Sequence, residues 1–213
     1  MLVDKNGVEY LTLQGFTYTN ENFEPKENFR SDGSYRLDFK DERDSVCVGA
    51  YMKVTGPKNE EFAGKLLGTH FTNRKNSGSY VIGIQLDGKR VRLRKEIHDD
   101  YTKNINPTPL ELGDLRGKWV GIMYFKINQP NGNVICQAFV DVTGLDSDGH
   151  PRNNWQKIFE CVDDGTIAEG RFKPVWLTPS LGPSKTQNTI RVDGQDKENY
   201  SYKHAFCREI IRS

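Results

Sequence analysis

The sequence predicts an all-β protein in which two antiparallel sheets pack face to face within a single domain. Three observations lead to this prediction. Apolar residues recur at every second position in segments of about five to twelve residues, which is the period of a strand with one buried face. Turn-forming residues separate these segments, and long helical apolar patterns without Gly or Pro inside them are lacking. The 213 residues contain no linker-like stretch, so one sandwich or barrel accounts for the whole length.

The clearest strand prediction covers Ser45–Thr55. Val46 and Val48 alternate there with Cys47 and Tyr51, so the segment has one apolar face. The other predicted strands, in chain order, are Tyr35–Phe39, Phe62–Phe71, Tyr80–Leu86, Val91–Ile97, Lys118–Asn128, Val134–Val142, Trp155–Cys161, Thr189–Val192 and Tyr200–Ile210.

The connections between these strands follow from their turn residues. Asp87-Gly88 separates two alternating segments and predicts a tight hairpin with a type I′ turn, because both positions tolerate positive φ. Two long irregular stretches, Asp99–Arg116 and Ala168–Gln187, contain prolines and are predicted to be ordered surface loops. A short helical turn is expected at Leu112–Arg116.

Charge and composition exclude several classes of protein. Thirty Lys and Arg face 29 Asp and Glu, so no strong global field attracts nucleic acid or an anionic membrane. No apolar run approaches the roughly 20 residues that span a bilayer, and the charged start at Met1–Lys5 predicts no signal peptide. We therefore expect cytoplasmic synthesis, no membrane insertion and no nucleic-acid partner. The four widely spaced cysteines are expected to be free thiols, and no zinc motif is present.

Six segments occur in an order that resembles a known family. They are Glu61–His70, Arg92–His98, Lys118–Ile122, Asn153–Lys157, Ile190–Gly194 and Cys207–Ile210. Together they resemble a little-characterised group of archaeal and viral concanavalin A-like jelly-roll proteins, related in fold to polysaccharide lyases and glucanases. The resemblance runs from about Ser34 to Ile210. It implies a single jelly-roll domain over residues 1–213, with residues 1–33 as an N-terminal segment that packs on the sandwich.

The resemblance also implies carbohydrate binding by the concave sheet. The strand Arg92–His98 carries Arg92, Arg94, Glu96 and His98 on one face, with about 6.6 Å between successive members. On a concave sheet this row would bind a polysaccharide, and the arginines would suit carboxylate or sulfate groups. On a convex or edge sheet it would be a solvated charged face.

Two further residues complete the expected binding surface. Lys65 lies on the predicted strand Phe62–Phe71, near whose end His70 lies. Trp176 lies in a long loop, where its indole could stack on a sugar ring. The alternative for Trp176 is a hydrophobic contact that holds the loop down.

A lyase acting on an anionic glycan is the first alternative function. It would need a base such as His70 or His98, an acid such as Tyr80 or Tyr124, and an arginine that neutralises the substrate carboxylate. The strand motifs typical of alginate lyases are absent, however. A glycoside hydrolase is less favoured, because the E-x-D-x-x-E signature of related glucanases is also absent.

A virion-surface or capsid-decorating protein, with capsid or homo-oligomer contacts, is the second alternative function. No cofactor or catalytic metal is predicted. The acidic turns Asp146–Gly149 and Asp163–Gly165 could bind a structural calcium ion, although acidic turns are common without metal.

Overall fold

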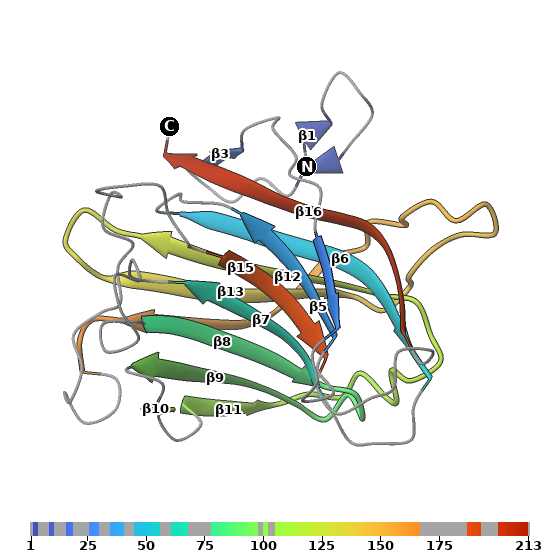
Figure 1. Cartoon of the computed structure of the whole chain (residues 1–213), viewed down its shortest axis with the longest axis horizontal. Coiled ribbons are helices and arrows are strands. Elements are labelled where there is room, and N and C mark those ends of the chain that lie inside the picture. The colour runs from blue at the N-terminus through green and yellow to red at the C-terminus, as the bar shows by residue number, and fades with distance from the viewer. Residues whose placement is uncertain are drawn as a thin grey trace.

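Strands form the whole regular structure of the described residues in this computed structural model, and none of those residues is helical (Figure 1). The described residues are 2–3, 9–10, 16–18, 26–29, 35–40, 45–55, 61–67, 78–97, 100–101, 105–166, 187–192 and 200–212. The strands make two large antiparallel sheets and a two-stranded ribbon, β1 (Leu2–Val3) with β2 (Glu9–Tyr10).

The eight-stranded sheet, called the large sheet below, has the order β10-β9-β8-β7-β15-β5-β4, and β11 also pairs with β9. Its strands are β10 (Asp100–Tyr101), β9 (Arg90–Ile97), β8 (Gly78–Gln85), β7 (Glu61–Leu67), β15 (Gln187–Val192), β5 (Tyr35–Lys40), β4 (Lys26–Phe29) and β11 (Ile105–Pro109).

The six-stranded sheet, called the small sheet below, has the order β14-β13-β12-β6-β16-β3. Its strands are β14 (Gln156–Asp163), β13 (Val134–Asp141), β12 (Val120–Asn128), β6 (Val46–Val54), β16 (Tyr200–Arg212) and β3 (Phe16–Tyr18).

The chain passes repeatedly from one sheet to the other. After β5 in the large sheet it forms β6 in the small sheet, then β7–β9 in the large sheet and β12–β14 in the small one. Finally, β15 lies in the large sheet and β16 in the small sheet. All pairings between the described strands are antiparallel. The predicted all-β jelly-roll sandwich of two antiparallel sheets is confirmed.

The core lies between the two sheets. Alternate residues of β8, such as Ile82, and of β12, such as Ile122, are fully buried in one apolar cluster. Each aliphatic side chain buried in this way stabilises the fold by about 1.5–3 kcal/mol. Tyr124 of β12 joins the layers directly, because its hydroxyl donates a 2.6 Å hydrogen bond to the carbonyl of Phe62 in β7.

Two predicted details of the connections are wrong. The stretch Asp99–Arg116 is not wholly irregular, since β10 and β11 lie in it and pair with β9 at the sheet edge. Prolines in β11 are tolerated there because an edge strand needs fewer backbone donors. The turn near its end falls at Arg116–Gly117, and no helical turn forms at Leu112–Arg116.

The hairpin between β8 and β9 is confirmed, but its turn type is not. Gly88 has φ of 70°, whereas Asp87 stays outside the positive-φ region that a type I′ turn requires at both central positions. The Gly88 N–H donates to the Gln85 carbonyl instead, so the four-residue turn closes one position earlier than predicted.

A β-bulge changes which face each residue of β16 occupies. The sequence pattern puts Tyr202 and Phe206 on one face, but the register shifts between Lys203 and Phe206. As a result Tyr202 packs against the core between the sheets, while Phe206 packs against a second apolar cluster that includes Cys47. The bulged residue His204 has φ of 51°, uncommon for a residue with a side chain.

Two predictions about whole segments lie largely outside the described residues. Residues 167–186, which include most of the second predicted loop, are not described. In the N-terminal region, β3 pairs with β16 and β4 pairs with β5. The packing of segment 1–33 as a unit stays a prediction.

Candidate functional site

Three charged side chains meet on the outer face of the large sheet, the face opposite the core. The Nε of Arg92 donates to Oε2 of Glu61 at 2.7 Å, and Nη2 of Arg94 donates to the other carboxylate oxygen, Oε1. Glu61 lies on β7 and the arginines lie on β9, so the contacts pass over the intervening strand β8. We call this group the Glu61–Arg92–Arg94 triad.

A glycine on the middle strand makes this contact sterically feasible. Gly83 of β8 is the register partner of both Ala63 and Arg92. A Cβ at position 83 would lie 2.3 Å from Oε2 of Glu61, far inside van der Waals contact. The absence of a side chain therefore leaves the space in which the Glu61 carboxylate lies.

The triad combines a nearly buried acid with partly exposed bases. The Glu61 side chain is 6% exposed, whereas those of Arg92 and Arg94 are 26% and 18% exposed. Neighbouring outer-face residues Ala63 and Val81 are fully buried. Two guanidinium groups share one carboxylate, so the three side chains of the triad together carry one net positive charge. Such a group can attract an anion while Glu61 holds the arginines in place.

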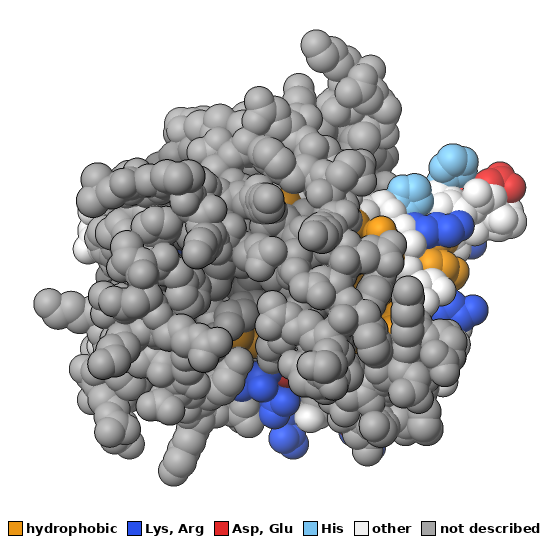
Figure 2. All heavy atoms as spheres, in the orientation of Figure 1, with side chains coloured by type: hydrophobic (Ala, Val, Ile, Leu, Met, Phe, Trp, Pro, Cys, Tyr) orange, Lys and Arg blue, Asp and Glu red, His pale blue; other side chains and the backbone are white. Residues whose placement is uncertain are grey.

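In Figure 2, basic side chains with part of an acidic side chain next to them are visible at the lower part of the face shown.

Other predicted binding residues are located only in part. Lys65 of β7 pairs with Val81, and Glu96 of β9 pairs with Ser79, but the side chains of Lys65 and Glu96 lie outside the described residues. Trp176 also lies outside them. Of the five predicted binding residues, the structure thus brings Arg92 and Arg94 together.

The two tyrosines predicted as catalytic acids lie in the core. Tyr80 and Tyr124 are completely buried. The Tyr80 hydroxyl donates to Asp163 at 2.6 Å, and burial together with the Glu61 charge raises the pKa of Tyr124 well above its usual value. A substrate on the outer face would not reach either hydroxyl. Both hydroxyls point into the core, and a role for Tyr80 or Tyr124 as the acid stays a prediction.

The two histidines predicted as bases, His70 and His98, lie outside the described residues. The histidines that are described, His150 and His204, are both exposed. His204 contacts the Gly149 carbonyl through Nε2 at 2.9 Å.

A second group of side chains gathers on the outer face of the small sheet. The Tyr51 ring contacts the rings of Trp155 and His204, with centroids 5.5 and 6.2 Å apart. The Tyr51 hydroxyl donates to the buried carboxylate of Asp141 at 2.8 Å, and burial together with this hydrogen bond raises the pKa of Tyr51. Tyr51 contacts both of the other rings, so the three side chains pack together. Figure 2 shows histidine, basic and apolar side chains together at the right of the view.

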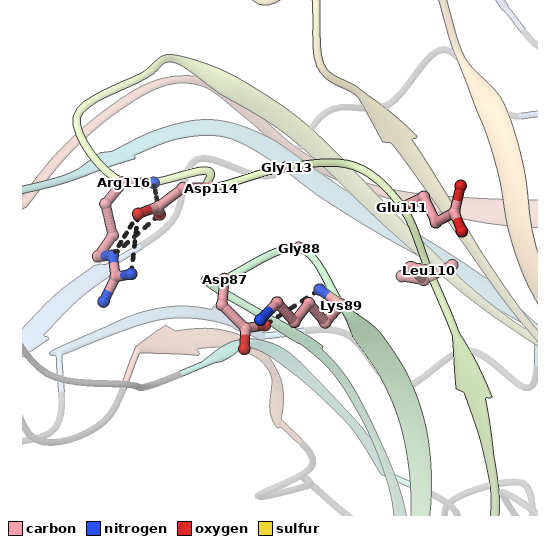
Figure 3. A pocket seen from close by; sticks show the side chains of 8 residues that line it. All are labelled: Asp87, Gly88, Lys89, Leu110, Glu111, Gly113, Asp114 and Arg116. Carbon is pink, nitrogen blue, oxygen red and sulfur yellow. Dashed lines mark hydrogen bonds and ion pairs between the residues drawn. The ribbon is translucent and has the colours of Figure 1, made fainter.

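A shallow pocket lies where the β8–β9 turn meets the loop after β11 (Figure 3). Backbone hydrogen bonds join the two segments, including Leu112 N–H to the Gly88 carbonyl and Leu115 N–H to the Leu86 carbonyl. Asp114 and Arg116 pair with each other at its rim at 2.8 Å. The lining residues are Asp87, Gly88, Lys89, Leu110, Glu111, Gly113, Asp114 and Arg116.

The acidic turns considered for calcium contain carboxylates that already have partners within the protein. Oδ1 of Asp146 accepts from the N–H groups of Asp148 and His150, and these bonds lower the pKa of Asp146. Asp163 forms an ion pair with Lys95. Among the described residues, no group of three or more His, Cys, Asp or Glu side chains is arranged to hold a metal.

The sequence pattern did not identify Glu61, which joins the two arginines. The sequence feature that could have identified Glu61 is its place two positions before the small residue Ala63, on a strand whose neighbour has a glycine at position 83.

In the part of the chain that is described, no helix is long and apolar enough to cross a membrane.

No protein-family model matches the sequence, and no curated protein sequence matches it. Several solved structures are similar to the chain. The carbohydrate-binding module CBM66 from Bacillus subtilis is 10% identical, with a TM-score of 0.47, and the match covers 92% of this chain and 96% of that one.

Two enzymes are similar at the same level. The PL-14 alginate lyase from Aplysia kurodai is 10% identical with a TM-score of 0.42, and the match covers 94% of this chain and 88% of the lyase. The Bacillus licheniformis β-glucanase is 13% identical with a TM-score of 0.35, covering 95% and 93%. A binding module, a lyase and a glucanase are thus among the solved structures similar to this chain.

Proposed function

We propose that the protein binds carbohydrate, and specifically an anionic polysaccharide, through the outer face of the large sheet around the Glu61–Arg92–Arg94 triad. The observation that carries this proposal is the sharing of one nearly buried carboxylate by two partly exposed arginines. The three side chains together carry one net positive charge, and the Arg92 side chain, at 26% exposure, is the more exposed of the two arginines.

The chemistry of Arg92 suits this ligand. Within the described residues its ion pair to Glu61 uses Nε, which leaves the terminal amino groups to donate to a ligand. A planar guanidinium can bind a sugar carboxylate or sulfate with two parallel hydrogen bonds. Because Glu61 already fixes the side chain, less rotamer entropy is lost on binding.

Binding is favoured over catalysis by the position of the tyrosines. Tyr80 and Tyr124 are buried and donate their hydroxyl hydrogen bonds inside the protein, so neither supplies an acid at the triad. A lyase would need His70 or His98 together with another acid, and it remains the alternative. In the binding proposal, Lys65, Glu96 and Trp176 extend the same surface.

The test is a binding survey combined with an activity assay. We expect the protein to retain acidic polysaccharides, such as uronate-containing and sulfated chains, more strongly than neutral ones, and this preference should weaken as salt increases. Ultraviolet absorbance of unsaturated uronates should not appear on incubation with uronate polymers, and its appearance would favour the lyase.

Equal retention of neutral and acidic chains would contradict the anionic ligand. Retention of none of these polysaccharides would contradict carbohydrate binding and leave the virion-surface role ahead.

A further inference from the structure

Three side chains form a row across the core face of the small sheet. Lys126 of β12 is the register partner of Cys136 of β13, and Cys136 is the register partner of Cys161 of β14. Lys126 and Cys136 are fully buried, and Cys161 is 9% exposed. Both cysteines belong to the core cluster between the sheets, so their side chains lie on the same face of adjacent strands.

The side chains of Cys136 and Cys161 are therefore direct cross-strand neighbours. Opposed residues of antiparallel strands have Cβ atoms about 4.5–5.5 Å apart, and a disulfide requires about 3.5–4.5 Å. A small approach of β14 toward β13 closes this difference. Among the described strands β14 is an edge strand that pairs only with β13, so it can move toward β13 without breaking another described pairing.

The remaining two cysteines lack this relationship. Cys47 belongs to the apolar cluster on the outer face of the small sheet, whereas Cys207 belongs to the core cluster on the other face. The sheet itself separates their side chains.

Solvent exposure differs between Cys136 and Cys161. Cys161, on the edge strand, has measurable exposure, while Cys136 lies deeper. Burial is the main cause that raises the pKa of both thiols, and the Lys126 ammonium partly opposes this for Cys136. Since the thiolate is the nucleophile, oxidation at neutral pH should be slow and should begin at Cys161.

We propose that Cys136 and Cys161 form a reversible thiol-oxidation site whose co-substrate is a low-molecular-weight disulfide such as oxidised glutathione. The Cys161 thiolate attacks one sulfur of that disulfide, its S–S bond breaks, and one small thiol leaves. Cys136 then attacks the Sγ of Cys161, the protein disulfide forms, and the second small thiol leaves. The protein loses two electrons and two protons, and the small disulfide gains them.

The proposal is tested on the full-length protein without any glycan, so its result is independent of the proposed binding function. The reduced protein is incubated with oxidised glutathione under native conditions, then denatured and alkylated with iodoacetamide. We expect two cysteines to escape alkylation and peptide mapping to join Cys136 to Cys161. Alkylation of all four cysteines, or a linkage that involves Cys47 or Cys207, would overturn the proposal.

Matched variants separate the two steps. A Cys47→Ser/Cys207→Ser double variant keeps the pair and should form the disulfide at the wild-type rate. Cys136→Ser removes the resolving thiol and should retain a glutathione adduct on Cys161, whereas Cys161→Ser should acquire none at Cys136. An adduct on Cys136 in Cys161→Ser would contradict the order of attack. If a serine variant does not fold, the wild-type peptide map still decides whether the site exists.

Discussion

Glu61 determines whether the two arginines of β9 act together. On a strand, Arg92 and Arg94 point the same way, and like charges in that arrangement repel one another unless a counter-charge lies between them. The Glu61 carboxylate provides it, with one oxygen for each guanidinium. The space for this carboxylate depends on Gly83, where a side chain would overlap Oε2.

The first prediction concerns that glycine. Gly83→Ala should destabilise the protein by about 1–3 kcal/mol, the usual range for overpacking, because the new methyl group displaces the Glu61 carboxylate. It should also weaken acidic glycan binding, since the arginines lose their common partner. Urea unfolding and glycan titration of the same variant measure both effects.

A double-mutant cycle provides the control. In a Glu61→Ala background the carboxylate is gone, so the alanine at position 83 should cost markedly less than in the wild-type background. An equal loss of unfolding free energy in both backgrounds would show that Gly83 is needed for the conformation or packing of β8 and not for the position of the Glu61 carboxylate.

At the scale of elements, a buried ion pair joins the two sheets. Lys95 of β9 and Asp163 of β14 are fully buried, their charged atoms are 2.5 Å apart, and Tyr80 of β8 donates to the same carboxylate. An ion pair in this environment stabilises the fold only while both partners are present, because a lone buried charge is strongly unfavourable.

The second prediction tests this link between sheets. Asp163→Asn keeps the shape but leaves the Lys95 charge without its carboxylate, and should cost about 3–5 kcal/mol of unfolding free energy. The neighbouring Asp164→Asn is the matched control, because Asp164 is exposed and bonds only to Thr166 among the described residues. Its effect should stay within about 0.5 kcal/mol. Equal urea midpoints for the two variants would contradict the buried ion pair.

The third prediction concerns the β8–β9 turn. Gly88 and Gly113 both have φ of 70°, but a Cβ at Gly88 would lie 1.9 Å from the Gly113 carbonyl, whereas a Cβ at Gly113 would meet nothing within 4 Å. Gly113→Ala should therefore cost about 1–2 kcal/mol from backbone conformation alone. Gly88→Ala should cost more, because it also separates the loop from the turn. Thermal midpoints that rank the variants in the opposite order would refute this account.

The strands could be predicted because their period depends on local sequence. The alternation at Ser45–Thr55 appears as β6, and the hairpin centred on Asp87-Gly88 already puts Gly83 opposite Arg92. The bulge at His204 could not be predicted. It inserts one extra residue into β16, and its effect is that the residues after it face the opposite side of the sheet from the one that strict alternation predicts. Nor could the register of β7 against β8, which puts Glu61 beside Gly83, be predicted, because these strands are separated by a long connection.

For the whole molecule, the nearly neutral net charge makes local charge decisive. With 30 basic and 29 acidic residues, long-range attraction of a polyanion is weak, so any selectivity for acidic glycans must come from a local group such as the triad. The sandwich places this group on the outside of a sheet whose other face is the core. Ligand contact and folding stability should consequently be separable at Arg92, since Arg94 can still pair with Glu61 when Arg92 is truncated.

Paired measurement of affinity and stability for Arg92→Ala tests the central claim most directly. Isothermal titration with an acidic oligosaccharide should show a loss of about 1.5–3 kcal/mol of binding free energy, the contribution of a charge-assisted hydrogen bond. The thermal midpoint should change little. Lys53→Ala, which removes one positive charge from the small sheet, should alter neither quantity. Unchanged affinity together with a large fall in the midpoint would contradict the account and assign Arg92 to structure alone.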